Sequence, residues 1–485
     1  MNRPTALFPA LADGSSRPAL SFGDRTLSYA ELAVWAGSLA ATLSTAHRVA
    51  VWATATPQTA VAVVAALLAG VPAVPLNPRI GGRELAHVVA DSAPSLVLAA
   101  AGDELPAELD GIPRTNIDAT TGPAGAPPAE PGPDHPALIV YTSGTTGPPK
   151  GAVLPRRALT STLDALQDAW GWDADDVLVH ALPLFHVHGL ILGILGPLRR
   201  GGSVRHLGRF STEGVARELS TGATMLFGVP TMYHRIAEAL STVPGDAALA
   251  EALAGARLLV SGSAALPARD HDRIEAATGR TVIERYGMTE TLMNTSVRAD
   301  GEPRAGTVGV PLPEVELRLV DEAGALIGTG PDGVGEIQVR GPNLFTEYLN
   351  RPDATAEAFT EDGWFRTGDM AVRDQDGYVR IVGRRATDLI KSGGYKIGAG
   401  EIENALMEYP GVRDAAVTGE PDADLGERIV AWIVPTDPQR RPDARKLTEH
   451  VAARLAPHKR PRIVRYLPEL PRNDLGKIMK RALRA

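Results

Sequence analysis

Short apolar runs alternate with alanine-rich segments over roughly the first 300 residues, and this alternation restricts the fold more than any other feature. The apolar runs have the length and composition of buried strands, and the segments between them carry apolar residues at helical spacing. Strands are predicted at residues 48–52, 95–99, 137–141 and 257–261, and helices include 29–43 and 212–219. Such a pattern predicts an α/β domain whose strands are mostly parallel and covered on both faces.

The pattern changes in the later part of the chain. Residues 309–340 contain alternating strands broken by Gly and Pro, which predicts a β-rich subdomain, with strands at 314–320 and 335–340. After Gly383 a mixed α+β pattern follows, with helices at 400–409 and 443–455 and strands at 414–419 and 429–435. We therefore predict a large N-terminal domain, residues 1–383, and a small C-terminal domain, residues 384–485. Residues 119–136, dominated by Pro, Gly and Ala, are interpreted as a surface linker.

Composition excludes several classes of function. The net charge is −8, so nothing indicates a nucleic-acid partner bound through bulk charge, and the cysteine count of 0 excludes disulfides, thiolate metal sites and a thioester on the chain itself. The longest apolar stretch, residues 60–76, contains Pro72 and Pro75 and is interpreted as a buried helix followed by a strand. The first 16 residues do not resemble a secretory signal. We expect a cytoplasmic protein without a membrane partner.

Lysine is scarce and unevenly distributed. The 49 basic residues include 7 lysines, of which one lies in the first 390 positions and six lie in the last 95. The early one, Lys150, ends a segment of small and hydroxyl residues directly after a predicted strand. Glycine and hydroxyl residues in such a loop can close around phosphate oxygens, whereas the spacing and Pro148 and Pro149 exclude a Walker A loop. The candidate phosphate ligands are Thr142, Ser143, Gly144, Thr145, Thr146, Gly147 and Lys150.

Four further segments carry residues suited to nucleotide chemistry. The first, ERYGMTET at 284–291, has an aromatic ring, a hydroxyl donor and a carboxylate that suits magnesium. The others are GWFRTGDM at 363–370, the long segment at 378–403, and LPRNDLGKIMKR at 470–481. In the last of these a turn displays Lys477, and Lys480 is expected to be a solvated tail lysine.

Together and in this order, the five segments resemble the adenylate-forming superfamily of acyl-CoA synthetases, peptide-synthetase adenylation domains and luciferases. The resemblance implies an α/β N-terminal domain that holds ATP, a β-rich subdomain, and a small α+β C-terminal domain that rotates. It also implies two half-reactions. A carboxylate first attacks the α-phosphate of ATP to give an acyl-adenylate and pyrophosphate, and a thiol then displaces AMP.

The resemblance also implies roles for individual residues. Lys477 would stabilise the transition state of the first half-reaction, with Thr289 as a phosphate donor and Glu290 as the Mg²⁺ ligand. The adenine and α-phosphate wall would comprise Gly262, Ser263, Ala264, Glu284, Tyr286, Gly287, Met288 and Thr289. Asp369 and Arg384 would contact the ribose. For coenzyme A the residues implied are Ser392, Gly393, Gly394 and Lys396, whereas the usual hinge position holds Ala386, which departs from the family.

The acid pocket has a less common feature. Many acyl-CoA synthetases have glycine before the Tyr-Gly-Met-Thr-Glu string, but here the residue is Arg285, which suggests an acid with a second carboxylate. The segment LPLFHVHGL at 182–190 also places His186 and His188 where a fatty or aryl acid would need apolar residues. Together these resemble malonyl-CoA synthetases, which implies malonate or methylmalonate as substrate. The residues expected around the acid are Ser261, His186, Val187, Arg285 and Met293.

Alternatives remain open from the sequence. Arg285 would be structural if it paired with Glu284 or another carboxylate, and His186 would be structural if it were a satisfied core histidine. Arg235 is a weaker candidate for the same anion. The enzyme would then be a ligase for another small carboxylic acid. Two other functions compete: an adenylation enzyme that loads a carrier protein, and a nucleotide-binding regulator that has lost turnover.

Overall fold

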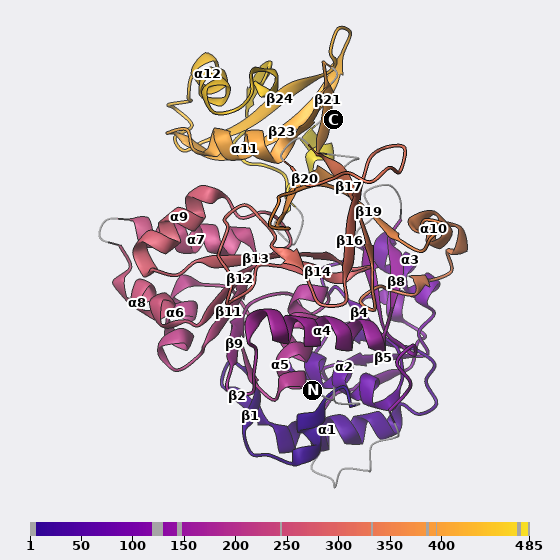
Figure 1. Cartoon of the computed structure of the whole chain (residues 1–485). Helices are drawn as coiled ribbons and strands as arrows, with labels where there is room; N and C mark the ends of the chain where they lie inside the picture. Colours follow the sequence, from indigo (N-terminus) through magenta and orange to yellow (C-terminus); the bar gives the residue numbers. More distant parts are fainter. Residues whose placement is uncertain are drawn as a thin grey trace.

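Two large sheets and their helices form most of the chain (Figure 1). The computed structural model describes residues 6–118, 130–142, 148–242, 245–330, 333–384, 388–393, 395–472 and 477–483. The first sheet has seven strands, in the order β18 (Glu347–Tyr348), β8 (Lys150–Pro155), β7 (Pro136–Thr142), β4 (Ala73–Leu76), β3 (Val49–Trp52), β5 (Leu96–Ala99) and β6 (Arg114–Asn116). Its central strands run parallel, and β8 and β18 add antiparallel strands at one edge.

The second sheet has nine strands and is also parallel at its centre. Its order is β15 (Val310–Pro311), β14 (Leu292–Ser296), β13 (Val282–Met288), β12 (Leu258–Ser261), β11 (Met225–Gly228), β9 (Val177–His180), β10 (Ser203–His206), β1 (Pro18–Phe22) and β2 (Arg25–Ser28). Antiparallel pairs occur only toward its two ends. The mostly parallel α/β architecture predicted from the alternation is confirmed.

Ten α-helices accompany these sheets in the described part of the chain. They are α1 (Tyr29–Thr42), α2 (Pro57–Ala69), α3 (Gly82–Ser92), α4 (Arg156–Trp170), α5 (Gly196–Arg200), α6 (Thr212–Ser220), α7 (Pro230–Ser241), α8 (Ala247–Gly255), α9 (Ala268–Thr278) and α10 (Pro352–Ala358). Three short turns of other helix types are η1 (Pro9–Asp13), η2 (Ala107–Leu109) and the π-helical η3 (His188–Leu195). Helix α1 begins with a capping box, in which Ser28 and Glu31 satisfy each other's backbone N–H groups.

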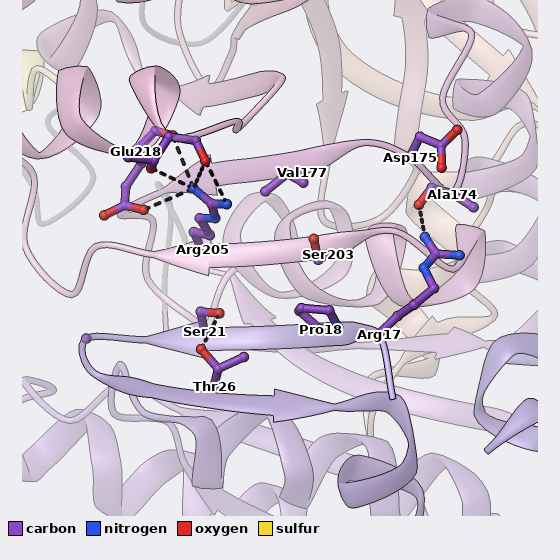
Figure 2. A pocket seen from close by; sticks show the side chains of 12 residues that line it. Arg17, Pro18, Ser21, Thr26, Ala174, Asp175, Val177, Ser203, Arg205 and Glu218 are labelled. Carbon is purple, nitrogen blue, oxygen red and sulfur yellow. Dashed lines mark hydrogen bonds and ion pairs between the residues drawn. The ribbon is translucent and has the colours of Figure 1, made fainter. Parts of the chain in front are cut away.

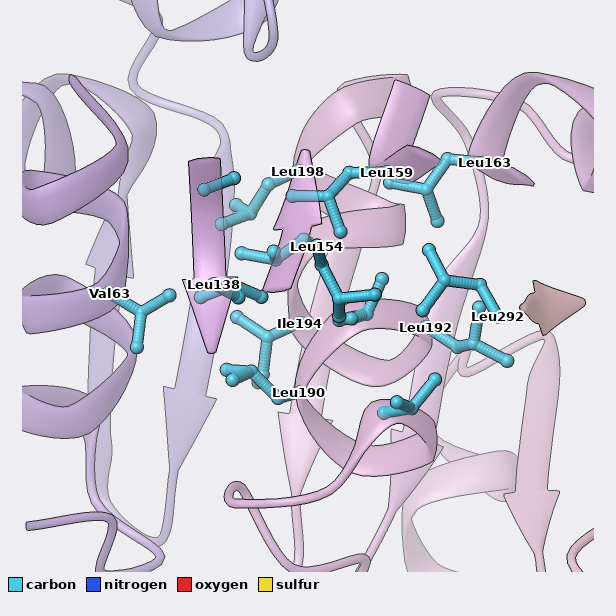
Figure 3. Packing of buried hydrophobic residues seen from close by; sticks show 14 of the residues in the cluster. Val63, Leu138, Leu154, Leu159, Leu163, Leu190, Leu192, Ile194, Leu198 and Leu292 are labelled. Atoms are coloured by element: carbon cyan, nitrogen blue, oxygen red, sulfur yellow. The ribbon is translucent and has the colours of Figure 1, made fainter. Parts of the chain in front are cut away.

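The largest hydrophobic core lies between the two sheets. Leu138 and Leu154 of the first sheet face Leu190 and Ile194 of η3, and Leu159 of α4 lies above them (Figure 3). Helix α2 is buried along most of its length, because apolar residues surround it on every side. It is followed by β4, as the interpretation of residues 60–76 predicted. No helix in the described residues combines the length and apolar character needed to cross a bilayer.

A four-stranded antiparallel sheet follows and leads to the C-terminal part. Its order is β16 (Glu316–Val320), β17 (Gly335–Arg340), β19 (Phe365–Arg373) and β20 (Val379–Arg384). This is the predicted β-rich subdomain, and it extends beyond the expected residues 309–340, because β19 and β20 complete it.

The small C-terminal unit stands apart in Figure 1, coloured orange to yellow. Its sheet contains β22 (Tyr395–Gly398), β21 (Leu389–Ser392), β24 (Gly426–Pro435) and β23 (Val412–Asp422), with β25 (Ile463–Tyr466) parallel to β24. Its helices are α11 (Ala399–Met407), α12 (Ala444–Arg454), η4 (Pro457–Lys459) and η5 (Lys480–Leu483). The unit has its own core around Ile402, Val417 and Ile433. A large α/β unit with a small α+β unit is the predicted fold class, whereas the exact boundary at residue 384 remains a prediction.

Candidate active site

The predicted phosphate loop connects two antiparallel strands of the first sheet. Thr142, the last residue of β7, lies opposite Lys150, the first residue of β8, and its hydroxyl is 3.4 Å from the Lys150 carbonyl oxygen. Ser143, Gly144, Thr145, Thr146 and Gly147 lie outside the described residues. The Lys150 ammonium lies 4.1 Å from the ring centroid of Tyr348, a cation–π contact that directs it toward β18.

Tyr348 connects Lys150 to Glu290. Its hydroxyl donates to Glu290 Oε1 at 2.7 Å, and burial, followed by the Glu290 charge, raises the pKa of Tyr348. Among the described residues no group of three or more His, Asp or Glu is arranged to hold a metal. Mg²⁺ in nucleotide sites is usually held by one or two carboxylates together with phosphate oxygens and water. Glu290 as its ligand remains a prediction.

The predicted ribose residues form one hydrogen-bonded group. Asp369 of β19 lies opposite Arg384 of β20, and Arg384 Nε is 3.1 Å from Asp369 Oδ1. The Tyr286 hydroxyl donates to the other carboxylate oxygen at 2.6 Å, and burial raises the pKa of Tyr286. Both sides of the Asp369 carboxylate are therefore fixed by neighbours from β13 and β20.

The turn after β13 allows little substitution. A Cβ at Gly287 would lie 1.7 Å from the Leu292 carbonyl oxygen, so only glycine fits there. Met288 and Thr289, both half-buried, follow it and lead to Glu290. The close approach of backbone at Gly287 explains how the string 286–290 bends so sharply at the end of β13.

Residues 262–264 form a loop directly after β12. Ser263 has φ +76°, a left-handed conformation that is strained for a residue with a side chain and is often retained at functional sites. Glu284 holds this loop in place, because its Oε2 accepts from the Leu266 N–H at 2.9 Å and its Oε1 lies 3.2 Å from His271 Nε2. Glu284 therefore supports the wall of the site through its carboxylate, while Ser263 and Ala264 are exposed.

Arg285 lies on the opposite face of β13 from Glu284, as adjacent residues in a strand must. Its guanidinium lies against Gly262, where an added Cβ would lie 2.3 Å from Cζ. Arg285 is 5% exposed, yet within the described part of the chain its Nε and one terminal nitrogen, Nη2, have no hydrogen-bond partner. Burial lowers the pKa of Arg285 to about 10. The alternative in which Arg285 pairs with Glu284 is therefore wrong in this structure.

Two further buried polar groups beside Arg285 have unpaired atoms. Among the residues that the structure describes, Ser261 Oγ, at the end of β12, has no partner, and neither ring nitrogen of His188 has one. Burial and the Arg285 charge lower the pKa of His188, so its ring is neutral. Buried polar atoms are normally hydrogen-bonded, so three unpaired groups in one place indicate a polar ligand.

The other residues predicted around the acid are His186, Val187 and Met293. His186 is half-buried and its ring lies 4.5 Å from that of Phe185, while Val187 and Met293 are buried. The sequence singles out His188 together with His186 but does not assign it a contact with the acid. In the structure His188 begins the π-helical η3, a type of turn frequent at functional sites.

Lys477 belongs to the C-terminal unit and interacts electrostatically with the predicted ribose residues. Surrounding protein atoms lower the pKa of Lys477, and the charge of Arg384 lowers it further, while Asp388 and Asp369 oppose the shift. Lys477 therefore lies within electrostatic range of both predicted ribose residues. Residues 473–476 lie outside the described part.

The predicted coenzyme A residues lie on the separate β21–β22 hairpin. Ser392 is buried and pairs with Gly426, and the Gly393 N–H donates to the Leu425 carbonyl at 2.9 Å in a left-handed turn, φ +59°. Gly394 and the side chain of Lys396 lie outside the described residues. The described residues of this set, Ser392 and Gly393, thus lie together on the small unit.

An exposed aromatic pair accompanies that hairpin and was not predicted. Tyr395 is 54% exposed and its ring stacks on His458, with centroids 4.0 Å apart and planes 11° apart. The exposed Arg460 and Arg462 follow His458 in the sequence. The basic run HKRPR at 458–462 was the available signal for an anion-binding surface.

A groove at the opposite end of the nine-stranded sheet is unrelated to these residues. It encloses about 560 Å³ beside β1 and β2 (Figure 2). Its two arginines are bound by the protein, Arg17 to the Ala174 carbonyl and Arg205 to Glu218 and Thr221. It shares no lining residue with the candidate active site.

Comparison with known proteins gives the family. The sequence pattern of the AMP-binding enzyme family matches residues 9–349, and that of the AMP-binding enzyme C-terminal domain matches residues 401–477. A malonate–CoA ligase of Arabidopsis thaliana is 40% identical over 72% of this chain and 60% of its own length. The chain spans about three fifths of the length of the first curated relatives that it matches.

Two solved structures are also similar. A malonyl-CoA ligase with methylmalonyl-CoA and AMP bound is 72% identical, with a TM-score of 0.74, covering 96% of this chain and 100% of that chain. ATP-bound MatB from Rhodopseudomonas palustris is 34% identical, with a TM-score of 0.89, covering 99% of this chain and 98% of that chain. With both sequence patterns in the order that the five motifs predict, the chain belongs to the AMP-binding enzyme family, the adenylate-forming enzymes.

Proposed function

We propose that this chain is an ATP-dependent ligase that converts malonate or methylmalonate to its coenzyme A thioester through an acyl-adenylate, releasing AMP and pyrophosphate. The observation that carries the proposal is the unpaired Arg285 guanidinium, with the unpaired Ser261 and His188 groups beside it. A buried cation without a partner is costly, and a second carboxylate on the acid would satisfy it. The names of the relatives, malonate–CoA and malonyl-CoA ligases, support the same substrate class.

In the first half-reaction one carboxylate oxygen of the acid attacks the α-phosphorus, and the bond to pyrophosphate breaks. Both reactants are anions, so the protein's task is to supply positive charge and to align the two groups. Lys477 and Arg384 supply charge near the α-phosphate and ribose, and Lys150 with the loop 142–147 holds the outer phosphates. Arg285 fixes the far carboxylate, so that only the other one reaches the phosphorus.

Magnesium would be held by Glu290, where it would neutralise phosphate charge. The hydrogen bond from Tyr348 orients that carboxylate, and Lys150 packs on the same ring. The three side chains form one connected support for the phosphates.

In the second half-reaction the thiol sulfur attacks the acyl carbon, AMP leaves, and the thiol proton passes to solvent. The thiol comes from outside the chain, which has no cysteine, and the names of the relatives support coenzyme A as its source. For this step we propose that residues 384–485 rotate about a point near Arg384. Ser392, Gly393, Gly394 and Lys396 would then line the pantetheine channel, and the Tyr395–His458 pair with Arg460 would receive the phosphorylated end.

The arrangement of the two units supports a first-half-reaction state. Lys477 lies within electrostatic range of Asp369 and Arg384. The overall match is also better to an ATP-bound structure at 34% identity than to a thioester product complex at 72% identity. Local structure is expected to be more similar at higher sequence identity. The lower TM-score with the more identical protein therefore supports a different placement of the small unit in the two structures.

The choice between acids depends on small apolar contacts. Val187 and Met293 would limit the space for a 2-substituent, and His186 would contact the acid beside them. Val187 and Met293 are buried and apolar, so they suit hydrogen or methyl at that carbon rather than a charged group. A cytoplasmic location remains a prediction from the sequence, and so does the absence of nucleic-acid and membrane partners.

The proposal is tested with purified protein, ATP, Mg²⁺ and a panel of acids, with and without coenzyme A. Malonate and methylmalonate should give pyrophosphate and a thioester, whereas acetate and propionate should be poor substrates. Absence of pyrophosphate with either dicarboxylate would reject the substrate class. A thioester with a carrier protein but not with coenzyme A would favour the carrier-loading alternative, and binding without turnover would favour the regulator.

A further inference from the structure

A buried ion cluster lies three residues beyond Lys477. Lys480 Nζ is 2.9 Å from Asp388 Oδ1 and 2.6 Å from Glu403 Oε1, and the Lys480 side chain is only 11% exposed. The expectation that Lys480 is a solvated tail lysine is therefore wrong. Its ammonium is buried and paired with two carboxylates from distant parts of the sequence. Their charges raise the pKa of Lys480 against the opposing effect of burial, so the ammonium is charged.

The two carboxylates belong to different elements of the small unit. Glu403 is on α11, and its Oε1 also accepts from the Val417 N–H at 2.7 Å, which ties it to β23. Asp388 Oδ2 accepts from the Arg384 N–H at 3.0 Å, and the Asp388 N–H donates to the Arg384 carbonyl at 2.8 Å. Lys480 thus joins the tail both to the body of the unit and to the main chain of Arg384.

The tail around Lys477 has few other anchors. On one side Arg472 pairs with Asp414, and an isolated bridge joins Arg472 to Ile478. On the other side Leu483 is buried beside Trp432. Lys477 lies between these anchors along the chain, and Lys480 is the charged anchor that follows it.

We propose that Lys480 is a positioning residue for the first half-reaction: its contacts with Asp388 and Glu403 hold the tail so that Lys477 is presented to the α-phosphate. The inference rests on the proposed role of Lys477 in adenylate formation. A lysine on an untethered segment would lose conformational entropy when it reaches the transition state. In a tethered segment that entropy is already lost before the substrate binds. The effect of removing the tether should therefore be confined to the step that uses Lys477.

The test separates the two half-reactions in Lys480→Met and Lys480→Arg. Adenylate formation is followed as malonate-dependent pyrophosphate release in single turnover. Thioester formation is followed from supplied malonyl-adenylate and coenzyme A as loss of free thiol, which reports only coenzyme A because the chain has no cysteine. We expect Lys480→Met to slow adenylate formation 10-fold to 100-fold, to leave thioester formation within twofold, and Lys480→Arg to recover most of the lost rate.

Controls address folding and charge. Lys446→Met changes an exposed lysine of α12 in the same unit and should alter neither rate. Because Lys480→Met leaves two carboxylates buried without their cation, the double variant with Glu403→Gln removes one of those charges without restoring the tether. We expect it to regain thermal stability but to remain slow in adenylate formation.

Three results would overturn the inference. Equal losses in both half-reactions, restored together by the double variant, would show a purely structural role. Parental adenylation rates in Lys480→Met would show that the tether is not needed. Lack of rescue by Lys480→Arg in a folded variant would show that the cation does not position Lys477. If the parent itself forms no malonyl-adenylate, the proposed function fails instead, which the parental reaction in the same experiment reveals.

Discussion

Replacing Arg285 by methionine should change stability and activity in opposite directions. Methionine keeps much of the length and fills the space against Gly262, so it removes the charge without leaving the large cavity that glycine would create. In the free protein the guanidinium is buried with two unpaired nitrogens, and its burial is unfavourable. In the complex with the acid the same guanidinium is expected to bind the second carboxylate.

The magnitudes follow from the structure. Burial lowers the pKa of Arg285 to about 10, well below that of a solvated arginine, which corresponds to a cost of about 3 kcal/mol at 1.36 kcal/mol per pKa unit. Arg285→Met should therefore raise the thermal midpoint by a few degrees. Leaving the second carboxylate of malonate buried without its partner costs about 2–5 kcal/mol, so kcat/KM for malonate should fall roughly 30-fold to 4,000-fold.

The assay compares kcat/KM for malonate and for propionate, together with thermal unfolding without ligands. Propionate has no second carboxylate, so its kcat/KM should change little or rise. Arg235→Met is a matched control, because Arg235 is exposed on α7, and it should leave both quantities unchanged. Malonate kinetics within threefold of the parent would refute the assignment of Arg285 to the acid, and a lower thermal midpoint would refute the cost assigned to its burial.

Three further perturbations test other parts of the structure. Arg269 Nη1 donates to the Met407 carbonyl at 2.9 Å, a contact between the two units. Arg269→Ala should therefore slow adenylate formation roughly tenfold, about 1.5 kcal/mol, without slowing thioester formation from supplied adenylate. Equal slowing of both reactions would contradict this expectation. Burial lowers the pKa of His206 to about 4, so the unfolded state takes up its proton first as the pH falls below about 6.5. The unfolding free energy should then drop by about 2 kcal/mol from this group between pH 7.5 and 5, and urea titrations of His206→Gln should show a shallower pH dependence than the parent. Arg460→Ala should raise the KM for coenzyme A several-fold and leave the KM for ATP unchanged, measured at constant ionic strength; an unchanged KM for coenzyme A would remove this residue from the thiol substrate's site.

The sequence by itself determined the family, the architecture and the order of the nucleotide motifs. Those features are local: a strand is recognised from a few apolar residues, and a phosphate loop from consecutive small residues followed by Lys150. Arg285 was also identifiable, because its position beside a recognisable string made an unexpected charge visible. Glu284 shows the limit of prediction from sequence. Its neighbours in the sequence do not reveal that its carboxylate accepts from the Leu266 N–H and contacts His271.

The tertiary structure decided which polar groups have partners. Tyr348 meets Glu290 across 58 positions of sequence, and Tyr286 meets Asp369 across 83. Lys480 is buried only because the sheet and helix of the small unit bring Asp388 and Glu403 to it. Hydrogen-bond partners and burial depend on which residues meet in three dimensions, and residue spacing along the sequence does not reveal them. The unpaired His188 and the paired Lys480 could therefore be recognised only in the folded chain.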